Sequence, residues 1–399
     1  HAVRVGEEAA ALAARYLGAD DLLASRARSD LAVAYHHVGR LDEAVQSFDR
    51  ALALQPNHAA AHNNRGNALW HSGRQLAALQ RFDAALALQP DMPMLRGDRL
   101  RKRLQLAEWG NLSVELSDLA RRAAQGEAVA PPFAMLGLLD SPPLHRRVAE
   151  AYARGRWPGE ARWSEPGTSA AGRDGRIHIG YFSADFHSHA TAFLMAGLFE
   201  RHDRARFKVT AYSFGPTVED AMRQRLRSAF DQFVEVGGLS DREVAALSRS
   251  HGIDIAVDLK GYTELSRPGI FACRAAPVQV NYIGYPGTMA VDFMDYLIAD
   301  PIVIPERSRV HFSEKIAYLP HSYQVNDDRR EVADRVFSRA ELGLPQEGVV
   351  FCCFNNGYKI LPDTFDAWMR VLKAVDGSVL WLFHSNEHGA SKLRLAAKA

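Results

Sequence analysis

The residues with the clearest chemical potential lie in the segment Ser183-Ala184-Asp185-Phe186-His187-Ser188-His189-Ala190-Thr191, directly after a strand-like stretch. Asp185 and His189 are four residues apart, and a carboxylate and an imidazole at the end of a strand can transfer protons. We expect a helix over Ala192–Glu200 with Thr191 as its N-cap, and its free N–H groups would favour an anion. Two readings without catalysis stay open. In the first, Asp185 only satisfies loop amides, and His187 and His189 are one surface histidine and one hydrogen-bonded histidine. In the second, the His-x-His pair binds zinc, although no third ligand at recognisable spacing accompanies it.

Three further loops carry polar or glycine-rich sequence. The first is Asp258-Leu259-Lys260-Gly261-Tyr262-Thr263, which Arg267 follows closely. The next, Gly284-Tyr285-Pro286-Gly287-Thr288, lets backbone approach a ligand, but it is also a good ordinary turn. In the last, Phe354-Asn355-Asn356-Gly357-Tyr358-Lys359-Ile360, a lysine beside a glycine suits a phosphate, with a solvated lysine as the alternative. Together these loops favour a phosphate-bearing ligand and do not specify a reaction.

The elements that must position these loops alternate between strands and helices. This alternation predicts a parallel, doubly wound sheet, in which ligands bind at the carboxyl ends of the strands. A second α/β unit begins near Val349, and the 51 residues from there to Ala399 are too few for a complete sheet, so we expect the chain to stop inside a domain. The strands expected are 176–183, 208–214, 232–236, 253–259, 278–283, 296–299 and 378–383, together with a strand and loop over 348–356. The helices expected are 192–200, 218–230, 241–251 and 363–375.

An internal repeat precedes the α/β region. Ala51-Leu52-Ala53-Leu54-Gln55-Pro56 recurs 34 residues later as Ala85-Leu86-Ala87-Leu88-Gln89-Pro90, and Phe48 and Phe82 share this offset. Small residues at helix contacts, a glycine at the turn and a closing proline predict tetratricopeptide (TPR) repeats at 25–58 and 59–92. We expect the array to have begun upstream. We expect the segment Pro131–Trp157, which contains the basic helical piece His145–Arg156, to cap it.

These patterns divide the chain into four regions. We expect TPR repeats over 1–125, a helical transition and linker over 126–175, a Rossmann-like lobe over 176–330, and the incomplete start of a nucleotide-binding lobe over 331–399. Within the transition, Pro166–Gly172 reads as the linker.

Composition excludes several classes of protein. The 48 Lys and Arg residues nearly balance 47 Asp and Glu residues, so nucleic acid is not the expected partner. No apolar stretch approaches the length of a membrane span. The three cysteines support neither a disulfide framework nor a cysteine-based zinc site, and with no signal-peptide pattern we expect a cytoplasmic protein. The sequence has no P-loop, no Gly-x-Gly-x-x-Gly and no Asp-x-Asp motif.

The repeats, combined with the loops around Asp185, Gly261, Gly284 and Lys359 in this order, resemble the protein O-linked N-acetylglucosamine transferase family, and its bacterial branch most. The resemblance implies a GT-B architecture with two Rossmann-like lobes and UDP-GlcNAc between them. It further implies an inverting transfer of GlcNAc to serine or threonine hydroxyls of protein acceptors, with no cofactor and no metal. Protein acceptors in the TPR groove are the expected partners, together with a second fragment completing the C-terminal lobe.

The same resemblance implies roles for single residues. His189 matches the histidine near sugar and acceptor that was once favoured as general base, and Asp185 matches another proposed proton acceptor. Lys359 matches the lysine that stabilises the departing UDP. The residues expected to line the donor site are Thr191, Ile283, Gly284, Arg267, Asn356 and Tyr358.

Two departures from the family pattern affect acceptor recognition. Asn64 represents the asparagine ladder that holds acceptor backbones, but Asp30 stands 34 residues earlier. A histidine found in animal members before the first lobe is replaced around Asp140-Ser141. An alternative function is therefore a TPR interaction scaffold whose transferase lobes bind a nucleotide sugar with little or no turnover. Another UDP-sugar donor is a third possibility.

Overall fold

The computed structural model describes residues 2–16, 22–157, 175–383 and 386–398. It contains two compact units, one formed by residues 1–122, 128–130 and 343–399, and the other by residues 123–127 and 131–342. Each unit is described by itself. The expected linker Pro166–Gly172 lies outside the described residues.

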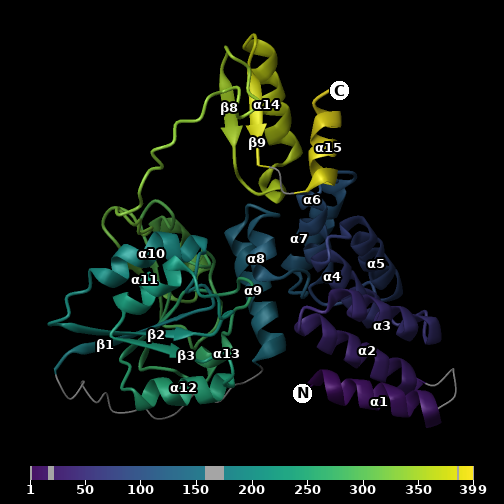
Figure 1. Cartoon of the computed structure of the whole chain (residues 1–399), viewed down its shortest axis with the longest axis horizontal. Coiled ribbons are helices and arrows are strands. Elements are labelled where there is room, and N and C mark those ends of the chain that lie inside the picture. The colour runs from purple at the N-terminus through teal and green to yellow at the C-terminus, as the bar shows by residue number, and fades with distance from the viewer. Residues whose placement is uncertain (1, 17–21, 158–174, 384–385, 399) are drawn as a thin grey trace. The chain divides into compact units, whose positions relative to one another are not determined.

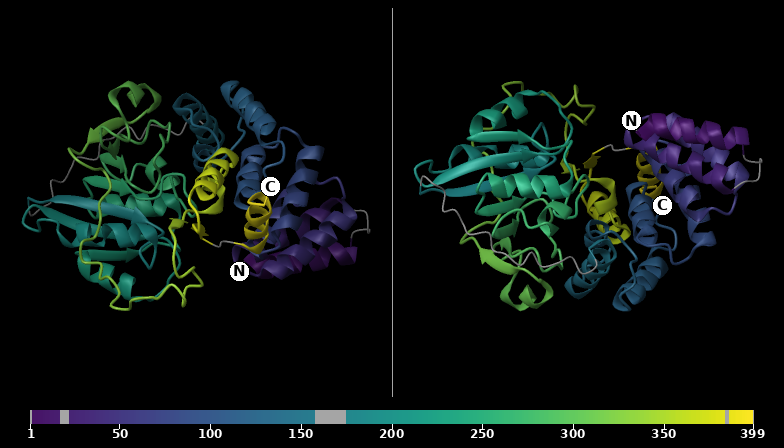
Figure 2. Two further views of the ribbon diagram at one scale, coloured as in Figure 1. Left: turned by 90° about the horizontal axis from the view of Figure 1, so that it is seen from above. Right: turned by 90° about the horizontal axis from the view of Figure 1, so that it is seen from below.

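The first unit begins with antiparallel helix pairs (Figures 1 and 2). Both expected repeats are present, with turns at Gly39 and Gly73 that adopt a positive φ of 77° and 81°. The helices are α1 (Ala2–Tyr16), α2 (Leu22–His37), α3 (Leu41–Leu54), α4 (Ala59–His71), α5 (Gln75–Leu88), α6 (Leu95–Gln105) and α7 (Leu112–Ala124).

The repeat period explains how these helices pack. Phe48 and Phe82 occupy equivalent positions in the two repeats and are both fully buried. A Cβ added to Gly66 would lie 2.5 Å from Phe82 Cε1, so only glycine lets α4 approach α5 this closely. Ala32, the residue equivalent to Gly66, is also fully buried. Small residues at the helix contacts are thus a requirement of the packing.

The C-terminal part of the first unit is a small α/β element. Strands β8 (Val350–Cys353) and β9 (Val379–Leu382) pair in parallel as a two-stranded sheet. The remaining elements are the 3₁₀ turn η2 (Gly357–Lys359) and the helices α14 (Pro362–Ala374) and α15 (Glu387–Ala396).

This α/β element packs on the end of the helical array. Asn386 Nδ2 donates a hydrogen bond to the carbonyl of Gln105 (3.1 Å), and His388 contacts Glu108 (2.7 Å). The rings of Trp109 and Phe365 lie 5.7 Å apart. The segment Pro131–Trp157, which we expected to cap the array, belongs to the other unit. Ala149 of its basic helix packs into the core of that unit. Its capping role stays a prediction.

The second unit contains a seven-stranded parallel sheet with the order β3-β2-β1-β4-β5-β6-β7. β1 lies between β2 and β4, so the direction of winding reverses beside it. The strands are β1 (Ile177–Ser183), β2 (Phe207–Ser213), β3 (Gln232–Glu235), β4 (Ile255–Asp258), β5 (Val278–Asn281), β6 (Tyr296–Ala299) and β7 (Lys315–Tyr318). The helices are α8 (Pro132–Leu136), α9 (Pro142–Arg156), α10 (Ala190–Glu200), α11 (Ala221–Ala229), α12 (Asp241–Ser250), α13 (Gly269–Ala272) and the 3₁₀ turn η1 (Glu306–His311).

Helices cover both faces of this sheet (Figure 1). On one face, Tyr181 and Val209 pack against α10 and α11. On the other face, Phe182 and Tyr212 stack with ring centroids 4.5 Å apart and pack against α12 and α13. Successive residues of a strand thus pack into the cores on opposite faces of the sheet. Both faces are buried, which is why the strands are continuous apolar runs in the sequence.

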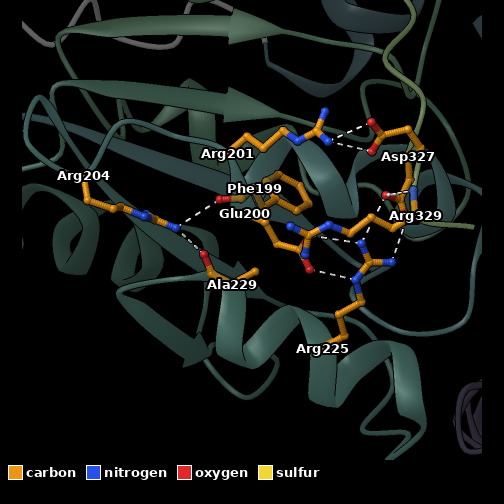
Figure 3. Close-up of polar contacts among 9 residues, drawn as sticks. Phe199, Glu200, Arg201, Arg204, Arg225, Ala229, Asp327 and Arg329 are labelled. Carbon is orange, nitrogen blue, oxygen red and sulfur yellow. Dashed lines mark hydrogen bonds and ion pairs between the residues drawn. The ribbon is translucent and has the colours of Figure 1, made fainter.

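A cluster of ion pairs holds the segment after β7 against α10 (Figure 3). Arg225 donates to Asp327 (2.6 Å) and to Glu200 (2.8 Å), and the Asp327 side chain has no exposed surface. Arg329 reaches Glu200 as well (3.1 Å). A Cβ on Gly197 would lie 2.8 Å from Asp327 Oδ1, so glycine makes room for this carboxylate on α10. These contacts fix the helix whose N-terminus carries His189.

None of the helices in the described ranges is long and apolar enough to cross a membrane.

Candidate active site

The loop after β1 lies at the point where the winding of the sheet reverses. Parallel sheets leave a crevice for ligands at the carboxyl ends of the strands at such a point. The backbone N–H of Asp185 donates to Ser183 Oγ (2.9 Å), and the backbone N–H of His187 donates to the carbonyl of Asp185 (2.8 Å). Asp185 is buried, whereas 42% of the His189 side chain is exposed. The loop thus places a buried carboxylate beneath an accessible imidazole.

Helix α10 begins two residues earlier than its sequence predicts. His189, with φ −145° and ψ 155°, is the N-cap, and its Nδ1 accepts a hydrogen bond from the backbone N–H of Thr191 (3.2 Å). The prediction that Thr191 is the N-cap is wrong, because the cap is the imidazole of His189 and not the hydroxyl of Thr191. Thr191 lies instead in the first turn of the helix.

Lys260, from the loop after β4, completes this cluster. Its Nζ lies 3.0 Å and 2.8 Å from the two carboxylate oxygens of Asp185, and both side chains are almost fully buried. Asp185 Oδ2 lies 3.4 Å from His189 Nδ1. Burial lowers the pKa of His189; Asp185 opposes this effect, and Lys260 and His187 add to it. The imidazole is therefore neutral at neutral pH.

Sequence reasoning assigned no role to Lys260. A signal was present, since Lys260 comes two residues after Asp258, the last residue of an apolar strand, and a lysine at such a position needs a partner when the loop is buried. The identity of the partner depends on the order of strands, which places β4 beside β1 and so brings together two loops separated by 75 residues.

Two residues of α11 hold the His189 loop from the other side. Asp220 caps α11 by accepting from the backbone N–H of Arg223 (2.8 Å), and it also accepts from the backbone N–H of Ser188 (2.8 Å). The fully buried Arg223 donates to the carbonyl of Phe186 (3.1 Å). The loop is thus hydrogen-bonded at both of these backbone positions. Sequence reasoning missed these residues, because their distance from the loop in the chain gives no signal.

The loop after β5 packs directly against the loop after β4. Ile283 adopts a positive φ of 58°, and the N–H of Gly284 donates to the carbonyl of Tyr282 (2.7 Å). A Cβ on Gly284 would lie 1.9 Å from the carbonyl oxygen of Leu259, so no other residue fits here. The structure thus places Ile283 and Gly284 beside the Lys260 loop.

Arg267 is hydrogen-bonded to residues outside the His189 cluster. Its guanidinium donates to Asp241 (2.7 Å) and to the carbonyls of Val236 (3.2 Å) and Leu239 (2.6 Å). These contacts tie the start of α12 to the preceding loop. Among the described residues, no hydrogen bond joins Arg267 to Asp185 or His189, and the role it plays in this structure is to hold that loop.

Asn356, Tyr358 and Lys359 belong to the other compact unit and are described within it. Lys359 follows β8 in the turn η2, and its Nζ donates to Asn355 Oδ1 (3.3 Å). The side chain of Lys359 is exposed and forms no ion pair with any carboxylate of the described residues. Asn356 is the N-cap of η2, and the guanidinium of Arg101 lies 5.9 Å from the centre of the Tyr358 ring. This strand end thus presents an uncompensated positive charge.

A cavity of about 440 Å³ lies behind this turn. Its lining comes from α14, β9, α15 and the end of α6, and Arg394 is the one charged residue among the described residues that line it. Most of the residues that line the cavity are apolar. Asn64, the expected acceptor contact, lies within α4 and accepts a long hydrogen bond from Asn63 (3.5 Å).

Asp258 gives the second unit a measurable pH dependence. Burial raises the pKa of Asp258 to about 6, while a hydrogen bond from the backbone N–H of Lys260 opposes this effect. Asp258 Oδ2 has no hydrogen-bond partner among the described residues. The folded state therefore favours the protonated carboxyl. The free energy of unfolding falls as pH rises from the usual pKa of an aspartate, through about 6, because the buried carboxyl then ionises.

We expect Asp258→Asn to remove this loss. The free energy of unfolding of the variant minus that of the unsubstituted protein should increase by about 2 kcal/mol from pH 4.5 to pH 7.5. The reason is that the neutral amide does not ionise, so the variant carries no penalty for a buried charge. Urea unfolding across this range measures the difference. The exposed Asp292→Asn is the matched control, and a pH-independent difference for Asp258→Asn would contradict the prediction.

Comparisons with known proteins agree with this arrangement. Residues 165–337 and 330–399 match the model of glycosyl transferase family 41, and residues 6–59 and 38–93 match a tetratricopeptide repeat model. The chain is 36% identical to a probable UDP-N-acetylglucosamine–peptide N-acetylglucosaminyltransferase (SEC) of Arabidopsis thaliana, over 56% of this chain and 23% of the plant protein. It is 26% identical to the corresponding transferase of Caenorhabditis elegans, over 55% of this chain and 29% of that protein.

A solved structure is similar along the whole chain. A mutant of the O-GlcNAc transferase of Thermobaculum terrenum, in which a lysine is replaced by methionine, superposes with a TM-score of 0.65 and 26% identity, over 100% of this chain and 72% of that one. The present chain spans about a quarter of the length of the two curated relatives. Its TPR helices are followed by the α/β architecture of a GT-B enzyme. Since the family model matches more than half of its residues, the chain belongs to glycosyl transferase family 41.

Proposed function

We propose that this chain acts in the transfer of GlcNAc from UDP-GlcNAc to serine or threonine hydroxyls of proteins, with inversion at the sugar. The observation that carries the proposal is that each α/β element presents an anion-ready strand end. One has the N-terminus of α10 behind the His189 loop, and the other has the unpaired Lys359 after β8. Both relatives described above carry this transferase activity in their names.

The chemistry required is mainly stabilisation of the leaving group. A serine or threonine hydroxyl is a poor nucleophile, so the departure of UDP must be made easier. The Lys359 ammonium would neutralise negative charge that develops on the diphosphate, and Asn356 and Tyr358 would position the nucleotide beside it. Thr191, in the first turn of α10, and the backbone at Ile283 and Gly284 would line the sugar pocket.

We propose a reaction without metal, since the sequence has no Asp-x-Asp motif that would bind a metal-bridged diphosphate. The cation in this role would be Lys359. Acceptor proteins would bind along the TPR helices, where Asn64 would hold acceptor backbone. Asp30 at the equivalent earlier position would change the pattern of acceptor contacts.

The test combines binding with transfer. Calorimetric titration of the protein with UDP should show saturable binding. Incubation with UDP-GlcNAc and a mixed peptide pool should add the mass of one N-acetylhexosamine to serine- or threonine-containing peptides. Binding of UDP without any such mass increment would support the alternative, a TPR interaction scaffold with an inactive transferase region. UDP-GalNAc and UDP-glucose, tested in parallel, would reveal another donor.

A further inference from the structure

The Nδ1 atom of His189 makes two contacts that require opposite protonation states. The backbone N–H of Thr191 points at Nδ1 from 3.2 Å, and this hydrogen bond needs a lone pair on the nitrogen. Asp185 Oδ2 lies 3.4 Å from the same nitrogen, and a hydrogen bond to this carboxylate needs a proton there. A neutral imidazole can satisfy only one of these partners through Nδ1.

Lys260 decides between the two partners. Its ammonium lies within 3.0 Å of both Asp185 oxygens, so the carboxylate already has a charged hydrogen-bond donor. The Thr191 amide, in contrast, belongs to the first turn of α10 and has no acceptor within the helix. The Nδ1 lone pair is thus the partner that the amide needs, while Asp185 does not need the imidazole.

The surrounding charge also disfavours a doubly protonated ring. The positive end of α10, the Lys260 ammonium and the neighbouring His187, whose ring centre lies 6.0 Å away, all oppose a positive charge on His189. Asp185 is the only one of these groups that favours the charge, and Lys260 compensates it. The ring is therefore held neutral, with its single proton left for Nε2.

We propose that His189 rests as the Nε2–H tautomer and donates a hydrogen bond from Nε2 to an oxygen of the bound nucleotide sugar. In this state it is not the proton acceptor for the attacking hydroxyl. The polar contacts of the ring with the described residues are made through Nδ1, and the imidazole is part-exposed, so Nε2 is left for a ligand. Lys260 is a positioning residue, which acts on His189 through Asp185. The identity of the ligand oxygen rests on the proposed function, but the tautomer does not.

The tautomer can be measured without any substrate. Long-range ¹H–¹⁵N correlation spectra of protein labelled with ¹⁵N-histidine separate the two neutral tautomers and the charged ring, and the His189→Asn spectrum identifies the His189 signals among the 16 histidines. We expect a protonated Nε2 and an unprotonated Nδ1 at neutral pH. A proton on Nδ1, alone or in a charged ring, would overturn the proposal.

Substitution of Lys260 tests its part in this arrangement. Lys260→Met should move the proton towards Nδ1, because Asp185 then lacks its ammonium partner. Lys260→Arg keeps the charge and should leave the spectrum unchanged. This variant is the one to measure if Lys260→Met does not fold. An unchanged Nε2–H tautomer in folded Lys260→Met, or a shift of the proton in Lys260→Arg, would remove Lys260 from the proposal.

Two amide substitutions separate a hydrogen-bond donor from a base in the transfer reaction. His189→Gln places an amide N–H near the position of Nε2, whereas His189→Asn provides only an oxygen near Nδ1, which preserves the N-cap. We expect kcat in the Gln variant to stay within about tenfold of the unsubstituted protein, and in the Asn variant to fall about 10²-fold. Neither amide can accept a proton, so equal losses in both variants would overturn the donor role. If the protein transfers no sugar at all, the proposed function fails while the spectra still decide the tautomer.

Discussion

Lys359→Ala should lower turnover of UDP-GlcNAc by roughly 10²- to 10³-fold while the protein remains folded. UDP departs with a negative charge on its terminal phosphate, and an ammonium at that position stabilises the transition state more than the ground state. Lys359 is suited to this role because its ammonium contacts only the neutral Asn355 among the described residues. A lysine already paired with a carboxylate would have to exchange partners first.

The measurement is kcat for UDP release with an acceptor peptide present, together with calorimetric affinity for UDP. Circular dichroism reports on folding, since Lys359 is exposed and makes no contact that its unit needs. Lys373→Ala, an exposed lysine on α14 of the same unit, is the matched control and should retain full activity. Near-normal turnover in Lys359→Ala would exclude the lysine from leaving-group stabilisation.

The architecture could be predicted because it depends on patterns that are local in sequence. The 34-residue period directly reports the helix contacts at Phe48, Phe82 and Gly66, and the apolar runs of β1 and β2 report strands covered on both faces. β7 was missed. Its four residues Lys315–Tyr318 have a part-exposed pattern and follow the 3₁₀ turn η1 instead of a crossover helix, so neither length nor flanking elements mark it as a strand.

The site could be predicted only in part. The prediction that the candidate loops follow the strands β1, β4 and β5 is confirmed, because strand ends can be found without knowledge of strand order. Their role in a site stays a prediction. The contact between Lys260 and Asp185 needs that order, and the capping role of His189 needs the geometry of its ring. The placement of Arg267 needs the position of Asp241, which lies 26 residues away in the chain. Sequence therefore predicted which loops lie at strand ends better than it predicted which group each side chain contacts.

Lys260→Met should cost about 3–5 kcal/mol in the free energy of unfolding, the largest stability effect expected of an exchange in the His189 loop region. Only 6% of the Lys260 side chain and 7% of the Asp185 side chain are exposed, so the variant leaves a carboxylate buried without its partner. Protonation or rearrangement of Asp185 would recover part of the loss, but water cannot replace the ammonium in so closed a site.

A double substitution shows whether this cost comes from the unpaired charge or from the lost side chain. Lys260→Met combined with Asp185→Leu removes both charges and fills similar volume, so it should recover most of the stability that Lys260→Met loses. The exposed Lys315→Met on β7 controls for the exchange of lysine for methionine. Urea unfolding of the unsubstituted protein, both single variants and the double variant gives the coupling energy between positions 185 and 260. If the double variant is as unstable as Lys260→Met, the main role of Lys260 is packing and not charge compensation. If the double variant recovers stability, Asp185 needs a permanent cation as its partner. This pairing is the condition that leaves the Nδ1 lone pair of His189 free to cap α10.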